Sequence, residues 1–491
     1  MNSSVVRYTL GQVLKIEAAL LLLPCIVALI YKEKTGIFFI LVAAMCAFLG
    51  IGMTLLKPVS NVFYLKEGCI ITALSWIFLS FFGALPFYLS EEIPSLTDAL
   101  FETISGFTTT GASILSEVES LSRCITFWRC FTHWIGGMGV LVFLLAIIPI
   151  GGGSQINIMK AESPGPSVGK LVPKIRSTAR ILYVIYFALT ILEMIFLVCG
   201  GMSGFEALNT AVATAGTGGF GIKNDSLTSY SPYLQWVVTV FMILFGINFN
   251  AYYLLLFRQF RKAFTMEEVI HYFAIIFIAI AIIFTRIFRT YDHALDALRD
   301  TAFQVASIIT TTGFSTVDFD KWPAVCQTVL VFLMFIGACA GSTGGGIKVS
   351  RLIILRKTII KEMISYVHPK SIKKIKMDDK PVEHEVVRAT NVFFITFVII
   401  FSLSVLLVSI DGNDLVTNFT AVAATINNIG PGLSMVGPTQ NFSHFSGFSK
   451  YILMFDMIAG RLELFPLLML FHPELWKEMF AHYIRKFSNS N

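Results

Sequence analysis

A short glycine-containing loop occurs four times in this chain, each time between long apolar segments. Its central glycines are Gly111, Gly219, Gly313 and Gly430, so the intervals are 219−111=108, 313−219=94 and 430−313=117 residues. Repetition at this period predicts four copies of one structural unit. A polar loop that recurs in an apolar chain predicts four walls of one pore.

The composition places the chain in a membrane. Of its 491 residues, 55% are apolar and 14% are charged, and the mean hydropathy is +0.74. These values exclude an ordinary soluble multidomain protein. The eight cysteines show no CxxC spacing and the eight histidines form no HxxxH or HExxH pair. We therefore expect no disulfide framework, no metal centre and no covalently bound cofactor.

Apolar runs at residues 10–31 and 36–56 are each long enough to cross a bilayer, which takes about 20 helical residues. The first run is predicted to be a retained helix, since no signal-peptide cleavage site follows it. Each repeat then contains a long apolar helix, a short semi-polar helix, the glycine loop and a second long apolar helix. The short helices, predicted at residues 97–107, 205–215, 294–309 and 416–426, cannot span and indicate re-entrant segments.

The predicted fold is therefore an all-α integral membrane protein. It has four pseudo-symmetric helix, re-entrant pore loop, helix repeats around one pore, preceded by two extra transmembrane helices, which gives ten spanning helices. The second long helices are expected at residues 127–150, 234–257, 325–355 (with a glycine break) and 451–471. The predicted units are residues 1–58 for the N-terminal helices, 59–160, 161–262 and 263–365 for repeats 1 to 3, and 366–491 for a basic connector with repeat 4.

Acidic residues stand thirteen positions before the central glycine in three repeats. They are Asp98 (111−13=98), Glu206 (219−13=206) and Asp300 (313−13=300), and the fourth repeat has Thr417 (430−13=417). An acid at the start of a short helix suits the positive end of the helix dipole. We favour a helix cap over an ion ligand for these residues.

Charged residues predict the orientation. The three connectors between repeats are basic, which predicts that they are cytoplasmic and that both termini are cytoplasmic. Their basic residues are Lys160, Lys170, Lys174, Arg176, Arg180, Arg258, Arg261, Lys262, Arg356, Lys357, Lys361, Lys370, Lys373, Lys374, Lys376, Lys380 and Arg388. The opposite flanks are acidic and predict a cation-attracting mouth. Their acids are Glu91, Glu92, Glu117, Glu119, Asp225, Asp318, Asp320, Asp411 and Asp414.

The loops themselves suit the coordination of a dehydrated cation. Non-helical backbone at membrane depth survives only inside protein or beside water. Glycine permits backbone angles that expose a carbonyl group, and threonine adds a hydroxyl acceptor. One such loop alone is equally an ordinary turn, whereas four in register favour an ion filter. The predicted ion-binding residues are Thr109, Thr110, Gly111, Thr217, Gly218, Gly219, Thr311, Thr312, Gly313, Asn428, Ile429 and Gly430.

These motifs resemble the Trk/Ktr/HKT superfamily of potassium transporters, and most closely its Trk-type membrane subunits. The resemblance covers nearly the whole chain, with TTTGA, GGF, TTGFST and NNIGPG in the four loops. The two leading helices favour the Trk branch. The resemblance implies potassium uptake through a single-file pore in the cytoplasmic membrane, a homodimer with one pore per subunit, and a cytoplasmic regulatory partner with nucleotide-binding RCK domains.

A glycine-rich run, Gly341–Gly346, interrupts the second long helix of repeat 3. The run does not match a phosphate-binding loop, in which the last glycine directly precedes the lysine, because here Ile347 separates Gly346 from Lys348. The run is either a flexible kink or, as the resemblance implies, an intramembrane loop that obstructs the pore. The residues assigned to this gate are Gly341, Gly344, Gly345, Gly346, Lys348 and Arg461.

Arg461 is expected about midway along the last spanning helix, with Asp456 and Glu463 nearby. A charge at that depth costs roughly 2.5 to 3.5 kcal/mol on insertion scales, so it faces a partner or water. It is either part of a structural ion pair or a cation barrier on the conduction path. For Asn248, Asn250 and Glu193 we favour packing hydrogen bonds over ion contact.

Alternatives remain at this point. A symporter coupled to sodium or protons also uses discontinuous segments. A membrane enzyme is disfavoured, because no metal pair, nucleophile and base pair or acid dyad is evident. A structural scaffold has no use for four outward glycine loops. The sequence thus favours a non-enzymatic potassium pathway.

Overall fold

The computed structural model describes residues 2–58, 64–139, 175–370, 374–475 and 477. The expected end of the second helix of repeat 1, and the basic residues Lys160, Lys170, Lys174 and Lys373, lie outside the described residues. The described part is helical apart from one antiparallel hairpin, β1 (Lys376–Met377) and β2 (Lys380–Pro381), in which Lys376 pairs with Pro381.

Three helices precede the repeats: α1 (Ser3–Leu20), α2 (Leu22–Tyr31) and α3 (Gly36–Thr54). Repeat 1 contains α4 (Leu65–Leu89), α5 (Leu96–Phe107) and α6 (Arg123–Met138). Repeat 2 contains α9 (Ile175–Cys199), α10 (Gly204–Ala215), α11 (Pro232–Phe245), α12 (Phe249–Leu256) and α13 (Phe260–Phe264).

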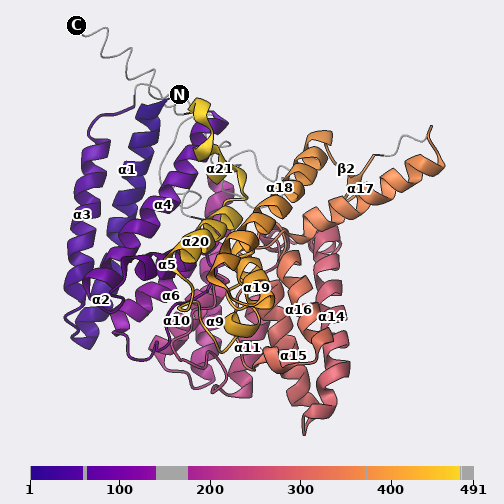
Figure 1. Cartoon of the computed structure of the whole chain (residues 1–491), viewed down its shortest axis with the longest axis horizontal. Coiled ribbons are helices and arrows are strands. Elements are labelled where there is room, and N and C mark those ends of the chain that lie inside the picture. The colour runs from indigo at the N-terminus through magenta and orange to yellow at the C-terminus, as the bar shows by residue number, and fades with distance from the viewer. Residues whose placement is uncertain (1, 59–63, 140–174, 371–373, 476, 478–491) are drawn as a thin grey trace.

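Repeat 3 contains α14 (Glu267–Ile287), η1 (Phe288–Thr290), α15 (Ala294–Ile309), η2 (Phe319–Lys321), α16 (Ala324–Ile336) and α17 (Val349–Val367). Repeat 4 contains α18 (His384–Val408), η3 (Ser409–Asp411), α19 (Leu415–Ile426), η4 (Ser434–Val436), α20 (Gly447–Arg461), α21 (Phe465–Leu468) and η5 (Met469–Phe471). Helix α17 projects away from the body of the molecule (Figure 1).

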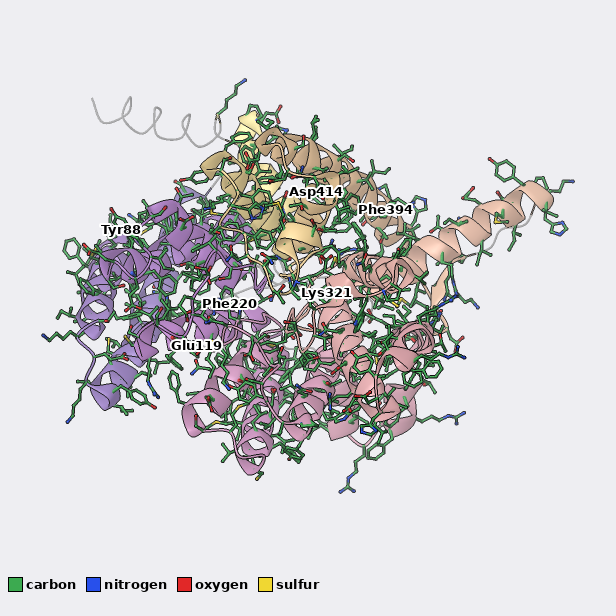
Figure 2. The ribbon with its side chains drawn as sticks, turned by 60° about the horizontal axis from the view of Figure 1, so that its bottom comes forward. Tyr88, Glu119, Phe220, Lys321, Phe394 and Asp414 are labelled. Carbon is green, nitrogen blue, oxygen red and sulfur yellow. The ribbon has the colours of Figure 1, made fainter. Side chains whose placement is uncertain are left out.

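The four repeats close into a ring. The second helix of each repeat packs on the short helix of the next, in the pairs α6 with α10, α11 with α15, α16 with α19, and α20 with α5. Figure 2 shows the corresponding sectors, purple, pink, salmon and tan, around a common centre near Phe220. The last repeat therefore contacts the first, and the short helices α5, α10, α15 and α19 all end at the centre of this ring.

Local capping explains why the short helices begin where they do. The Ser203 hydroxyl accepts from the Glu206 N–H at 3.3 Å, and the Glu206 carboxylate accepts from the Ser203 N–H at 3.2 Å, which is a capping box. In α5 the Ser95 hydroxyl caps the helix, and Asp98 instead bonds Lys450 at 2.6 Å. The cap interpretation is thus right for Glu206. It is wrong for Asp300, which lies within α15.

The outer helices carry the apolar surface of a membrane protein. Phe48 on α3 and Phe277 on α14 are 78% and 66% exposed. Six helical segments in the described ranges are long and apolar enough to span a bilayer, or up to seven if α11 and α12 are one bent span. The sequence predicted ten spanning helices, one of them with a glycine break. The difference lies in the second helices of the repeats.

Three of those second helices break beneath the loops. The continuous spans predicted at residues 234–257 and 451–471 are therefore wrong, whereas the break predicted within residues 325–355 is present. Helices α11 and α12 are bent by 89°. Helix α16 ends at Ile336, and α17 starts only at Val349. Helix α20 ends at Arg461, where Glu463 and Leu464 follow with φ of 60° and 66°. Helical hydropathy alone does not reveal the break after Arg461, because mostly apolar residues continue through it.

Candidate functional site

The backbone of the four glycine loops repeats the same conformation. Two positions before each central glycine, the non-glycine residues Thr109, Thr217, Thr311 and Asn428 have φ of 57°, 53°, 59° and 55°. The central glycines Gly111, Gly219, Gly313 and Gly430 have φ of 77°, 78°, 83° and 99°. Left-handed backbone is costly for threonine and asparagine, so its recurrence at one position marks a shared constraint.

The hydrogen bonds of the loops are equivalent too. In every repeat the residue two before the glycine donates its N–H to the carbonyl three residues earlier, and the residue one before donates to the carbonyl five residues earlier. The second set of bonds comprises Thr110 to Ser105 at 2.8 Å, Gly218 to Ala213 at 3.0 Å, Thr312 to Ser307 at 2.9 Å and Ile429 to Ala424 at 2.8 Å. Each loop is therefore built onto the end of its short helix.

The central glycines bring the loops together in a closed ring. A Cβ atom on Gly111 would overlap the carbonyl oxygen of Gly218, and one on Gly219 would overlap that of Thr312. The same relation joins Gly313 to Ile429, and Gly430 to Thr110. Each glycine thus faces the carbonyl group before the glycine of the next loop. The four central glycines, about a hundred residues apart in sequence, thus come together in one ring.

A hollow of about 130 Å³ adjoins this ring and is lined by all four central glycines. Its charged lining residues are Arg129 and Lys223. None of the nine acids assigned to the mouth lines this hollow directly, but Glu117 and Glu119 accept hydrogen bonds from Asn224, which does line it. The acidic mouth stays a prediction. Others of these acids accept hydrogen bonds from backbone N–H groups, as when Asp320 of repeat 3 accepts from the Ser434 N–H of repeat 4 at 3.0 Å.

The glycine-rich segment lies directly beneath the ring. It extends from Gly337 to Lys348, between α16 and α17, and is longer than the predicted run. The Gly345 N–H donates to the Thr311 hydroxyl at 2.6 Å. A Cβ on Gly345 would overlap the carbonyl of Asn427. The segment, which we call the glycine loop, therefore rests against the inner ends of loops 3 and 4.

The glycine loop is fixed from its other side by Glu268, which the sequence did not single out, together with Asn248 and Lys348, which it did. The Glu268 carboxylate on α14 accepts from the Ala340 N–H at 2.6 Å and from the Ser350 N–H at 3.1 Å, so it joins both ends of the loop. It also accepts from the Asn248 amide at 3.0 Å. Lys348 is buried and donates to the Gly344 carbonyl within the loop.

Arg461 contacts the glycine loop, and the two together form the layer beneath the ring. Its guanidinium donates to the Thr109 hydroxyl at 3.2 Å and to the Thr343 carbonyl at 2.9 Å. It also donates to the carbonyls of Gly136 and Gly137, at the end of α6. Arg461 therefore links loop 1, the glycine loop and α6. It stands at the end of α20, not midway along a span as predicted.

Comparison with known proteins agrees with this architecture. The profile of the TrkH family, described as cation transport protein, matches residues 37–483. The chain belongs to the TrkH family. The Trk system potassium uptake protein TrkH of Salmonella typhimurium is 35% identical over 97% of this chain and all of that protein. The protein of the same name from Vibrio parahaemolyticus is 33% identical over 96% of this chain and 99% of its own length.

A solved structure extends the comparison to the fold. The crystal structure of the potassium transporter TrkH from Vibrio parahaemolyticus superposes with a TM-score of 0.87 and 32% identity, covering 97% of this chain and all of that chain. This match confirms the predicted fold class. Membership of a transport family also confirms that the chain is a multi-pass membrane transporter and not an enzyme. The assignments of individual filter and gate residues stay predictions.

Sequence reasoning missed a buried ion pair, Arg129 with Glu102, that supports the ring in this TrkH-family chain. Arg129 on α6 lies 2.5 Å from the Glu102 carboxylate on α5. Arg129 also donates to the Gly221 carbonyl at 2.9 Å, and Glu102 accepts from the Ile114 N–H at 3.1 Å. The pair therefore joins loops 1 and 2. The sequence signal that could have predicted this pair was the presence of two opposite charges on neighbouring amphipathic helices.

The acids near Arg461 contact other groups. Glu463 forms an ion pair with Arg351 on α17, and Asp456 accepts from the Ser404 hydroxyl at 2.7 Å. The first pair ties the start of α17 to the turn that follows Arg461. Among the other polar residues noted in the sequence, Asn248 makes the packing hydrogen bonds that we expected. Glu193 is fully buried on α9.

Proposed function

We propose that the protein takes up potassium through the ring of four loops, and that the glycine loop and Arg461 obstruct this path until a regulatory partner opens it. The observation that carries the proposal is the ring itself, in which four loops with one backbone conformation surround one opening. Its relatives are named potassium uptake proteins.

The chemistry of the ring suits a monovalent cation. The short helices α5, α10, α15 and α19 all end at the loops, and each helix C-terminus carries about half a negative charge. Backbone carbonyls and threonine hydroxyls replace the water of a dehydrated ion without adding a formal charge. A neutral ring of this kind binds potassium weakly enough to release it. The substrate is the ion, and no resident cofactor is proposed.

The layer beneath the ring suits a barrier. A unit positive charge about 4 Å from a cation costs about 4 kcal/mol at an effective dielectric constant of 20. Arg461 bonds Thr109, one of the proposed ion-binding residues, so its charge acts at the inner end of the path. The gate comprises Arg461 with the glycine-loop residues Gly341, Gly344, Gly345, Gly346 and Lys348.

The assembly that we propose is a homodimer in the cytoplasmic membrane with one pore per subunit and both termini cytoplasmic. The charge bias of the connectors supports this orientation. An RCK-type partner that binds nucleotides docks on the cytoplasmic side, to which we assign the basic connector that includes α17. Helix α17 projects away from the body of the molecule (Figure 1). Because α17 begins directly after the glycine loop, a pull on α17 is transmitted to the loop.

Flux measurements test the proposal. Purified protein in proteoliposomes is assayed under potassium, rubidium, sodium and lithium gradients, with and without a pH gradient. We expect potassium and rubidium to move down their gradients whatever the proton and sodium gradients are. An obligatory dependence on protons or sodium would establish a symporter instead. Absence of potassium flux from correctly folded protein would overturn the proposed function.

A further inference from the structure

The second loop lacks the side chains that support loops 1 and 3 from behind. In loop 1 the hydroxyls of Thr108 and Thr110 lie 2.8 Å apart, and in loop 3 the hydroxyls of Thr310 and Thr312 lie 2.8 Å apart. The corresponding positions of loop 2 are Gly216 and Gly218. Loop 2 nevertheless has the same backbone conformation as loops 1 and 3, so another group must support it.

That group is His133 on α6. Its side chain is fully buried, and a Cβ on Gly218 would overlap its imidazole ring. A Cβ on Gly216 would overlap its backbone carbonyl. The histidine therefore fills the space that the two threonine side chains fill in loops 1 and 3. The glycines of loop 2 are needed because this residue, from the neighbouring repeat, stands behind them.

The ring of His133 is bonded on both sides. Its Nδ1 lies 2.8 Å from the Gly106 carbonyl, at the end of α5, and the Phe220 N–H donates to its Nε2 at 3.2 Å. A carbonyl only accepts and an N–H only donates, so the ring is neutral with its proton on Nδ1. One side chain thus connects the short helix of repeat 1 to the loop of repeat 2.

The bond to Phe220 determines where the Gly219 carbonyl points. Gly219 and Phe220 share one peptide unit, and in a trans peptide the C=O and N–H groups point in opposite directions. Because the N–H points at His133, the Gly219 carbonyl points away from it. Gly219 is one of the four central glycines of the ring.

We propose that His133 is a positioning residue for ion selectivity, which aims the Gly219 carbonyl at the ion and replaces the threonine pair that loop 2 lacks. This inference rests on the proposed potassium pathway. A residue of repeat 1 thus contributes to the ion selectivity of the loop in repeat 2. It also predicts that selectivity depends on a hydrogen bond behind the loop as well as on the loop residues themselves.

Two amide variants separate this role from simple space filling. The amide of His133→Gln reaches about the place of Nε2 and can accept from Phe220, whereas that of His133→Asn reaches only the place of Nδ1. We expect H133Q to keep the potassium-to-sodium flux ratio within about twofold of wild type. We expect H133N to lower that ratio roughly fivefold, the effect of one hydrogen bond. Equal ratios in H133N, H133Q and wild type would overturn the proposal.

A rescue experiment covers variants that fold poorly. Gly218→Ala places a methyl group against the His133 ring, so we expect loss of uptake and a lower melting temperature. The double variant H133A/G218A removes the ring, so uptake should recover while the potassium-to-sodium ratio stays low. Gly204→Ala in the same repeat meets open space and is the matched control. Full activity of G218A beside an intact histidine would contradict the packing.

A spectroscopic measurement separates this inference from the proposed function. Selective ¹⁵N labelling of histidine should show one imidazole with its proton on Nδ1 that does not titrate between pH 5 and pH 8, and that is absent from H133N. A wild-type protein that conducts no potassium but shows this signal would refute the transport proposal alone. A conducting protein in which this imidazole titrates would refute the role of His133 alone.

Discussion

The ring of loops and the layer directly beneath it are built on different rules. In the ring every repeat contributes one loop with the same left-handed positions and the same hydrogen bonds. In the layer beneath, within the part of the chain that the structure describes, repeat 3 contributes the glycine loop and repeat 4 contributes Arg461. A site that binds a spherical ion gains from equivalent walls, whereas an obstruction needs only one movable part. The symmetry is thus kept where the ion is held and lost where the path is closed.

Breaking the equivalence of the ring should have the largest effect. Gly313→Ala forces a Cβ onto the Ile429 carbonyl and requires a left-handed φ of 83° for alanine. We expect potassium uptake to fall more than a hundredfold, because the carbonyl positions of two loops are disturbed. Flux into proteoliposomes measures this, and Gly52→Ala, which meets open space, is the control. Uptake near the wild-type level in G313A would show that the ring is not the conduction path.

Removing the charge from the lower layer should have the opposite sign. Arg461→Ala is expected to raise potassium flux about tenfold, since it removes the positive charge next to Thr109. Arg461→Lys should stay close to wild type because the charge remains. Arg289→Ala, at an exposed position beside Phe288, is the matched control. Unchanged or lower flux in folded R461A protein would refute the barrier and leave Arg461 a structural residue.

Loosening the glycine loop without touching the path should have a smaller effect. Glu268→Ala removes the acceptor that joins Ala340 to Ser350. We expect flux to rise about threefold and the melting temperature to fall, because each unpaired buried N–H costs about 1 to 3 kcal/mol. The neighbouring Glu267→Ala, which loses a partly exposed pair with Lys357, is the control. A glycine loop that stays equally closed in E268A would mean that another contact holds it.

The sequence predicted the ring better than the layer beneath. The short helices were predicted at 97–107 and 205–215, and they occur at Leu96–Phe107 and Gly204–Ala215. The four loops have similar sequences, so aligning the repeats on their central glycines reveals the ring. Glu268 and His133 act through tertiary contacts with backbone groups far along the chain, and no local pattern marks such residues. The helix breaks at Phe245 and Arg461 were missed because contacts with other repeats form there. The Cys339 N–H donates to the Gly246 carbonyl at 3.1 Å, and the Arg461 guanidinium donates to the carbonyls of Gly136 and Gly137.

The outer rim, by which we mean the nine acids assigned to the mouth, allows the smallest and most specific test, because one of these acids, Asp414, caps the short helix α19. The Asp414 carboxylate accepts from the Thr417 hydroxyl at 2.5 Å and from its N–H at 3.0 Å, and these bonds lower the pKa of Asp414. A folded pKa below the unfolded one means that the carboxylate stabilises the protein above its unfolded pKa. This contribution is lost as the pH falls through the folded pKa.

We therefore expect Asp414→Ala to lower the free energy of unfolding by about 1 kcal/mol at pH 7, the usual value of a helix cap. The difference from wild type should shrink as the pH falls below about 4, the usual pKa of an unfolded aspartate, and through the lower pKa of Asp414 in the folded protein. Asp414→Asn keeps a capping oxygen and should lose only the pH dependence. Thermal unfolding from pH 7 to pH 3 measures both, and the potassium-to-sodium ratio should not change. A shift in that ratio in D414A would bring the rim into the ion path, and the ring would no longer account for selectivity by itself.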